Sequence, residues 1–179
     1  MTNRERLAAA AKLTAWGYLL IRIDLNLGAL DILPGWLGYL LILQALPAFG
    51  EEEPSAKLLR PLGIVLALWE GAGWLAALCG VTVDSYLLTV LAGVVELYFH
   101  FQLLTDLSHI AGKYACPQEG KLLTLRTVYT VVATLSFLTL PWEDWTAAAF
   151  AVVLTGMVTA IWICKTLFSF RRSLAEAAA

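Results

Sequence analysis

The chain has 179 residues, of which 60% are hydrophobic and 15% are charged, and its formal net charge is −2. Soluble domains are usually about 45–50% apolar and about 25% charged, so this composition indicates an integral membrane protein. Its mean hydropathy of +0.75 agrees. The scattered basic residues exclude a nucleic-acid-binding surface, and the longest polar stretch, "GEEEPSAKLLRP", is too short for a separate soluble domain.

Apolar runs separated by polar residues, proline or glycine predict one transmembrane domain covering residues 1–179. A helix needs roughly 18 or more such residues to cross a hydrocarbon core about 30 Å thick. The predicted helices, in chain order, are 8–24, 33–49, 59–80, 86–112, 121–140 and 145–168. We therefore expect an all-α polytopic bundle of six transmembrane helices, arranged as three antiparallel pairs.

The positions of the basic residues predict how these helices are oriented. If both termini are cytoplasmic, every basic residue except Arg22 lies on the inner side. This distribution satisfies the positive-inside rule and favours an N-in, C-in protein of the bacterial cytoplasmic membrane. The basic N-terminus is not followed by a small-x-small cleavage site, so the first helix is expected to be retained.

The segment that joins the first two predicted helices does not divide clearly into a helix, a loop and a helix. A second helix that began after Pro34 would span only about 21 Å from Trp36 to Phe49, which is short of the core. Either this helix begins near Leu30, or residues 26–35 enter the protein as irregular backbone, which is tolerated only beside protein or a wet cavity. Such interrupted segments occur at transporter binding sites. An ordinary outer loop followed by a proline-started helix is the favoured interpretation.

A resemblance to known proteins lies in this region. The runs I-D-L-N (23–26) and L-D-I-L-P-G-W-L-G-Y-L-L-I (30–42) resemble the N-terminal segment of a group of small multi-spanning membrane proteins of Gram-positive bacteria. In that group an acidic, glycine-containing segment precedes a helix starting I-L-P-x-x-x-G-Y, with aspartate common where this chain has Gly35. The group has no assigned activity. The resemblance therefore implies a bacterial cell-membrane protein and transfers no functional residue.

Two glutamates and a histidine fall inside predicted helices. Glu70 lies about 13 Å into the third helix from the cytoplasmic side, and Glu96 lies about 15 Å into the fourth from the outer side. His100 follows Glu96 by four residues and shares its helix face. A charged group at the helix centre costs about 2.5–3.5 kcal/mol on insertion scales, so these groups are expected to face the bundle interior and meet partners.

Three roles are open to this group. It could bind a proton, a cation or a small solute; it could hold helices together by hydrogen bonds; or it could act as a metal or catalytic site. Its spacing matches no recognised metal motif, and we predict no cofactor or metal. The predicted function is a small transport or membrane ligand-binding component. The alternative is a non-enzymatic membrane assembly or accessory protein, with a partner membrane subunit or a second copy as partner.

Arg22 is predicted to lie in the outer part of the first helix. It lies too far from the midplane to meet Glu70, so the expected local partners are Asp24, Asn26 and Asp31. These four residues would form either an outer vestibule leading towards the buried glutamates or a plain interfacial charge cluster.

A last pair of candidates lies at the cytoplasmic end of the fourth helix. The seven-residue spacing of His109 and Cys116 is similar to that of membrane peptidases that process quorum-sensing propeptides, although the intervening sequence does not match. A cysteine nucleophile needs a positioned base and a lowered pKa. An intramembrane cysteine peptidase is thus the third functional alternative. The polar stripe of Gln102, Asp106, His109 and Lys113 is expected to be solvated or to dock a partner subunit.

Overall fold

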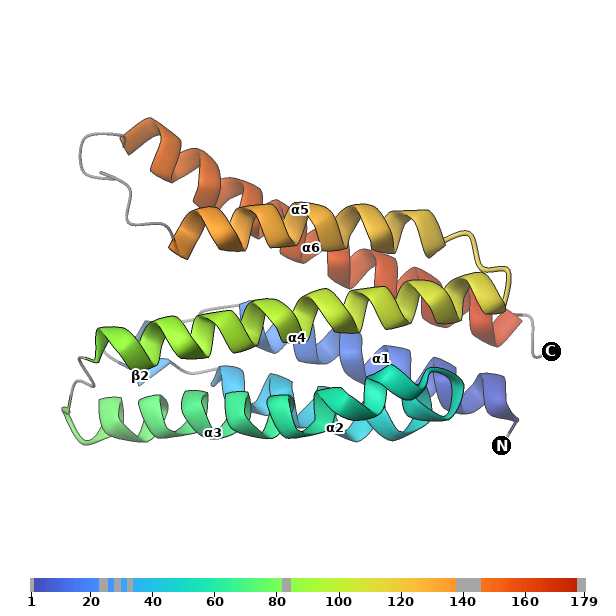
Figure 1. Cartoon of the computed structure of the whole chain (residues 1–179), viewed down its shortest axis with the longest axis horizontal. Helices are drawn as coiled ribbons and strands as arrows, with labels where there is room; N and C mark the ends of the chain where they lie inside the picture. Colours follow the sequence, from blue (N-terminus) through green and yellow to red (C-terminus); the bar gives the residue numbers. More distant parts are fainter. Residues whose placement is uncertain are drawn as a thin grey trace.

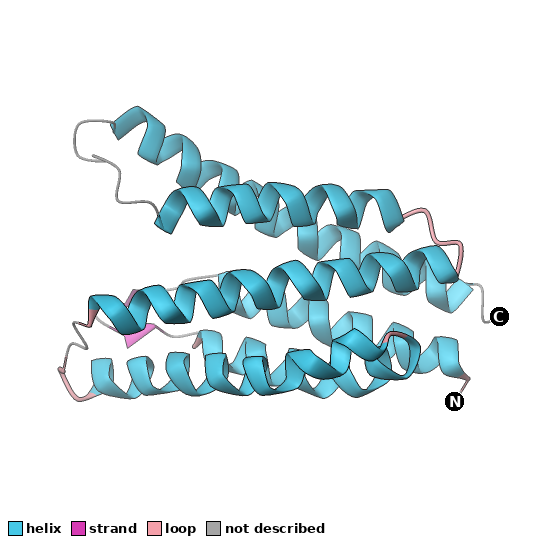
Figure 2. Ribbon diagram, viewed as in Figure 1, coloured by secondary structure: helices cyan, strands magenta, loops and turns pink. Residues whose placement is uncertain are grey.

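The computed structural model describes residues 2–22, 26–27, 30–31, 34–81, 85–137 and 146–176; for 26–27, 30–31 and Phe137 we describe the backbone alone. Within these ranges the chain forms six long α-helices (Figures 1 and 2). They are α1 Asn3–Arg22, α2 Gly35–Glu52, α3 Leu59–Leu78, α4 Tyr86–Lys113, α5 Glu119–Phe137 and α6 Thr146–Glu176. A 3-10 helix, η1 (Pro54–Leu58), joins α2 to α3. The predicted helical fold is confirmed.

The helices lie side by side along the long axis of the molecule. Both ends of the chain lie at one end of the bundle, called here the terminal end; the α3–α4 connection lies at the opposite, far end (Figure 1). Each helix packs against the next one in the sequence, and α6 packs against α1, so the described helices close into a ring. The three predicted antiparallel pairs are therefore segments of one ring rather than separate units.

Three of the described helical segments are long and apolar enough to span a membrane: Pro54–Leu78, which includes η1 and α3, then α4 and α6. Their large apolar side chains point outwards, as at Leu68 (67% exposed) and Ile161 (68% exposed). Outward apolar side chains on such helices are the pattern expected where lipid tails replace water. The chain is thus a helical membrane protein.

Helix α1 starts earlier than predicted because of a local capping motif. The backbone N–H of Glu5 donates to the Thr2 hydroxyl at 3.3 Å, and the backbone N–H of Thr2 donates to the Glu5 carboxylate at 2.8 Å. This reciprocal capping box satisfies N–H groups that the first turn of a helix otherwise leaves without partners. It places the helix start at Asn3 rather than residue 8.

Helices α1 and α2 touch through their backbones at two glycines. A Cβ atom on Gly38 would lie 2.5 Å from the carbonyl oxygen of Gly17, and one on Gly17 would lie 2.7 Å from that of Gly38. Both distances are below van der Waals contact, so neither position has room for a side chain. Small residues of this kind allow helices to approach closely in lipid.

Helix α2 starts at Gly35, with Pro34 as its N-cap. The prediction of a helix beginning near Leu30 is wrong, because Leu30–Asp31 forms a two-residue strand, β2, paired antiparallel with β1, Asn26–Leu27. The length missing at this end is recovered at the other, where α2 continues to Glu52. Its 18 residues span about 27 Å at 1.5 Å per residue. A re-entrant path for residues 26–35 stays a prediction, since 23–25, 28–29 and 32–33 lie outside the described residues.

The packed core occupies the half of the bundle nearer the terminal end. Its fully buried large side chains include Leu7, Phe49, Phe99, Leu103 and Phe170. On α3 the buried positions end at Leu66, and the remaining turns towards Leu78 are exposed or half-buried. The far half of α3 accordingly has no buried residue among those described.

Candidate functional site

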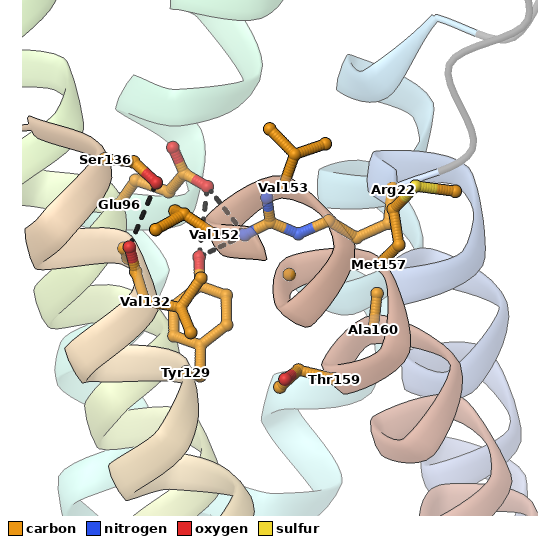
Figure 3. Close-up of a pocket in the computed structure, with 12 residues that line it drawn as sticks. Arg22, Glu96, Tyr129, Val132, Ser136, Val152, Val153, Met157, Thr159 and Ala160 are labelled. Atoms are coloured by element: carbon orange, nitrogen blue, oxygen red, sulfur yellow. Dashed lines mark hydrogen bonds and ion pairs between the residues drawn. The ribbon is translucent and has the colours of Figure 1, made fainter. Parts of the chain in front are cut away.

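The centre of the candidate site is an ion pair between Arg22 and Glu96. Arg22 ends α1, and its Nη2 lies 3.2 Å from Oε1 of Glu96 on α4. Tyr129 on α5 joins both: its hydroxyl donates to Glu96 Oε1 at 3.2 Å, accepts a short hydrogen bond from Arg22, and its ring lies 5.0 Å from the guanidinium. In Figure 3 the three side chains converge from three helices. The arrangement neutralises two charges at membrane depth.

His100 lies next to Glu96, one helical turn further along α4. Its Nε2 is 3.8 Å from Glu96 Oε1, too far for a hydrogen bond, and its Nδ1 is 3.0 Å from the Tyr18 hydroxyl on α1. The imidazole is fully buried, and the rings of Tyr18, Tyr39 and Tyr129 lie 5.0 to 6.0 Å from it, centroid to centroid. Nε2 has no hydrogen-bond partner among the described residues. The cluster therefore keeps one polar atom available beside Glu96.

A cavity of about 290 Å³ adjoins the ion pair. Arg22, Glu96 and Tyr129 form its polar wall, and α5 and α6 supply the remaining, mainly apolar wall (Figure 3). That wall consists of Val132, Ala133, Ser136, Val152, Val153, Gly156, Met157, Thr159 and Ala160. An apolar pocket with a few convergent polar groups is the usual form of a small-molecule site, and this volume lies close to the lower end of the range of about 300–1,000 Å³.

Glu70 lies at the start of α2. Its Oε2 is 3.6 Å from the position that a Cβ atom on Gly35 would take, and Gly35 is the first residue of α2. Pro34, the N-cap, makes no side-chain capping hydrogen bond, so a carboxylate from α3 supplies the negative charge that a helix N-terminus favours. Next to it, the rings of Trp36 and Trp74 meet edge to face at 6.3 Å. The Glu70 carboxylate on α3 thus lies close to the first residue of α2.

The predicted triad is therefore brought together in part. Glu96 and His100 lie side by side, as their spacing predicts, while the charged partner found on Glu96 is Arg22. Glu70 and Glu96 both lie within electrostatic range of the Tyr39 hydroxyl, which is the link between them that the structure describes. The group that the structure shows is thus an Arg–Glu–His cluster of Arg22, Glu96 and His100.

Arg22 has a charged partner that the sequence prediction did not name, Glu96. The long side chain of Arg22 extends from the end of α1 towards the middle of the bundle and reaches Glu96 (Figure 3). A prediction based on the depth of the Cα atom underestimates an arginine, whose charged group lies at the end of a long flexible stem. Asp24 lies outside the described residues, and of Asn26 and Asp31 only the backbone is described, so the rest of the predicted vestibule stays a prediction.

The two catalytic candidates lie in unsuitable surroundings. Cys116 is 7% exposed, and the Tyr114 carbonyl lies 3.8 Å from its thiol. Burial raises the pKa of this thiol, whereas a nucleophilic cysteine needs a lowered one. His109 is exposed on α4. Among the described residues, no group of three or more His, Cys, Asp or Glu could hold a metal ion.

The polar stripe at the terminal end of α4 is mostly occupied by partners within the chain. Asp106 is buried and accepts hydrogen bonds from Ser55 and Gln102, each at 2.7 Å. Lys113 forms a short ion pair with Glu52 at the end of α2. The expectation of a solvated stripe is therefore wrong for Asp106, because η1 folds over that part of α4 and brings Ser55 to it.

Whole-chain comparisons bear on the resemblance of residues 23–42 to the small Gram-positive membrane proteins. No protein-family model, no curated protein and no solved structure matches the chain. The resemblance stays a prediction, and the geometry of the Arg22–Glu96 cluster carries the functional argument.

Tyr129 and Tyr18 are the site residues that the sequence prediction missed. Tyrosine is common in membrane helices as an interfacial residue, so its presence gives little signal. A signal was nevertheless present: Tyr129 lies ten residues into α5, too far from either end of that helix for an interfacial position. An amphipathic residue at that depth needs a hydrogen-bond partner.

Proposed function

We propose that the protein is a six-span component of a bacterial cytoplasmic membrane that binds a small solute for transport or capture. The solute occupies the cavity and contacts the Arg22–Glu96 pair and Tyr129, with His100 buried behind Glu96. The observation that carries this proposal is the meeting of ionisable side chains from α1 and α4 beside a cavity of about 290 Å³. Ionisable residues at membrane depth are rare and usually belong to substrate or ion pathways.

The same proposal includes an orientation with both termini in the cytoplasm. Its support is that both chain ends lie at the terminal end, as an even number of crossings requires (Figure 1). Basic residues gather there as well, at the start of α3, at the start of α5 and at the end of α6: Arg60, Lys121, Arg171 and Arg172. The positive-inside rule then assigns the terminal end to the cytoplasm and the Arg22–Glu96 cluster to the outer half.

Cysteine labelling tests this orientation. Cys79 is exposed at the far end of α3, whereas Cys116 and Cys164 are buried. A membrane-impermeant maleimide applied to intact cells should label the protein, and Cys79→Ser should abolish the labelling. If Cys79 reacts only after the cells are opened, the proposed orientation is wrong.

Ligand binding is tested by thermal unfolding in lipid nanodiscs against panels of small carboxylates, amines and neutral amphiphiles. A ligand present at 100 times its Kd stabilises the folded state by about 2.7 kcal/mol. We expect one chemical class to raise the melting temperature of the wild type. Arg22→Gln and the cavity-filling Gly156→Leu should lose this response, and Gly73→Leu, at an open position on α3, should keep it. A response that all variants share would contradict the proposal.

A second candidate is a non-enzymatic assembly or accessory protein. The observation that favours it is that Arg22, Glu96 and Tyr129 partner one another. In that case the double variant Arg22→Gln/Glu96→Gln would change stability or association with a partner membrane subunit or a second copy. An assembly or accessory protein would show no ligand-induced rise in melting temperature in any variant, so the thermal screen separates the two functions.

A further inference from the structure

The cavity beside the ion pair adjoins a groove. This groove, of about 370 Å³, runs between α5 and α6 and is almost wholly apolar. Its lining consists of Thr127, Val128, Val131, Val132, Leu135, Ala151, Val152 and Thr155. Val132 and Val152 also line the cavity, so the same two side chains border both spaces.

Helices α5 and α6, which line the groove, cross at an angle (Figure 1). The rim of the groove is exposed, with Val131 54% exposed, and α6 is one of the helices that qualify as membrane spans. A groove of this kind in a bilayer faces lipid tails rather than water. Contact between the helices is kept at Gly156, where a Cβ atom would lie 3.6 Å from Val132.

The charge of the cavity limits which ligand can bind. Arg22 and Glu96 neutralise each other, and His100 is buried among aromatic rings. A ligand with a charged head group would leave one uncompensated charge in a medium of low dielectric constant, which is costly. A neutral head group avoids this cost and can still exchange hydrogen bonds with Arg22, Glu96 and Tyr129.

We propose that the ligand is a lipid-soluble, single-chain amphiphile with an uncharged hydrogen-bonding head group. The head lies in the cavity at the Arg22–Glu96 pair, and the tail lies in the α5–α6 groove, entering from the bilayer between Val132 and Val152. The inference rests on the proposed function and adds the chemical class of the ligand and its route. Arg22 and Glu96 bind the head group, and the apolar groove favours a ligand with a hydrocarbon chain.

The test uses a photoactivatable 1-decanol, with a diazirine on its tail, bound to the full chain in nanodiscs. Saturable labelling should map to peptides of α5 and α6, and unlabelled 1-decanol should compete better than decanoate or decylamine. Ala151→Trp fills the groove without touching the cavity lining. We expect it to weaken competition by about tenfold, equivalent to about 1.4 kcal/mol. Leu68→Trp, on the lipid-facing side of α3, is the matched control and should behave as wild type.

A second groove variant, Val128→Trp on α5, guards against misfolding of the first, and melting temperatures of all variants are measured alongside. The inference is overturned if labelling that depends on Arg22 and Glu96 persists in both Ala151→Trp and Val128→Trp. It is also overturned if decanoate or decylamine competes better than 1-decanol. Either result leaves the proposed function standing. Labelling that Arg22→Gln and Glu96→Gln do not change overturns the proposed function itself. Labelling that both these variants and the groove variants weaken supports both.

Discussion

The two halves of the bundle differ in how completely side chains fill their interiors. In the terminal half, side chains from α1, α2, α4 and α6 fill the interior and are fully buried, as at Leu7 and Leu107. In the far half, α5 and α6 leave a cavity and a groove, and the interior carries an ion pair. The difference indicates that packing in the terminal half stabilises the fold. The far half is thereby free to keep unfilled space and charged groups.

The largest effect that tests this comparison is truncation of a leucine on α4. Leu107, in the terminal half, is fully buried, whereas Leu91, in the far half, is 53% exposed. Leu107→Ala should destabilise the protein by about 2–5 kcal/mol, because it leaves a cavity in a packed core. Leu91→Ala should cost far less, since lipid fills the space. Unfolding in sodium dodecyl sulfate measures both; equal losses would show that the halves are packed alike.

A smaller effect is expected from the glycine contact between α1 and α2. Gly38→Val forces a side chain into the Gly17 carbonyl and should cost about 1–3 kcal/mol, the usual range for overpacking. Gly73→Val is the control, because nothing lies within 4 Å of a Cβ atom there. The same unfolding assay applies. A Gly38→Val protein as stable as Gly73→Val would mean that the two helices can separate freely.

Next in size is the role of Glu70 at the start of α2. Loss of its charge in Glu70→Gln should destabilise the protein by about 0.3–1 kcal/mol, the usual value of a charge at a helix end. Glu70→Lys should cost more, because it places a positive charge at the positive end of α2. The unfolding midpoints of these two variants are compared with wild type. If Lys is tolerated as well as Gln, Glu70 does not serve the helix terminus.

The smallest effect concerns pH at the terminal end. The hydrogen bond from Lys113, helped by those from Tyr114 and Asn3, lowers the pKa of Glu52 below its ordinary 4.5. The stability that this carboxylate contributes is therefore present above pH 4.5 and is lost as the pH falls through the lowered pKa. Unfolding midpoints measured between neutral and acidic pH should fall in wild type. The fall should be weaker in Glu52→Gln, and identical profiles would contradict the assignment.

The positions of the helices could be predicted from the sequence because each helix is a long apolar run with a polar boundary. Five of the six predicted starts lie within two residues of those observed; the exception is α1, where the capping box of Thr2 and Glu5 carries the helix back to Asn3. The sequence signal for that box was present. It was outweighed by the polar composition of the segment, which lies outside the apolar run.

The sequence predicted only part of the candidate site. Glu96 and His100 lie on one helix, so their spacing alone placed them together. The meeting of Arg22 and Tyr129 with Glu96 depends on where α1 and α5 lie relative to α4, and a single sequence carries no record of contacts between distant helices. The position of Glu70 beside the start of α2 was missed for the same reason, because it joins two different helices.

The pairing of Arg22 with Glu96 has a consequence for how the protein is made. In the proposed orientation α1 emerges from the ribosome before α4 and carries Arg22 to the outer side of the membrane. Glu96 follows 74 residues later, which at about 5–20 residues per second is a delay of roughly 4–15 s. For that interval the guanidinium is without its carboxylate. Arg22 then has to stay hydrated at the outer interface, and it turns inwards only when α4 has been inserted.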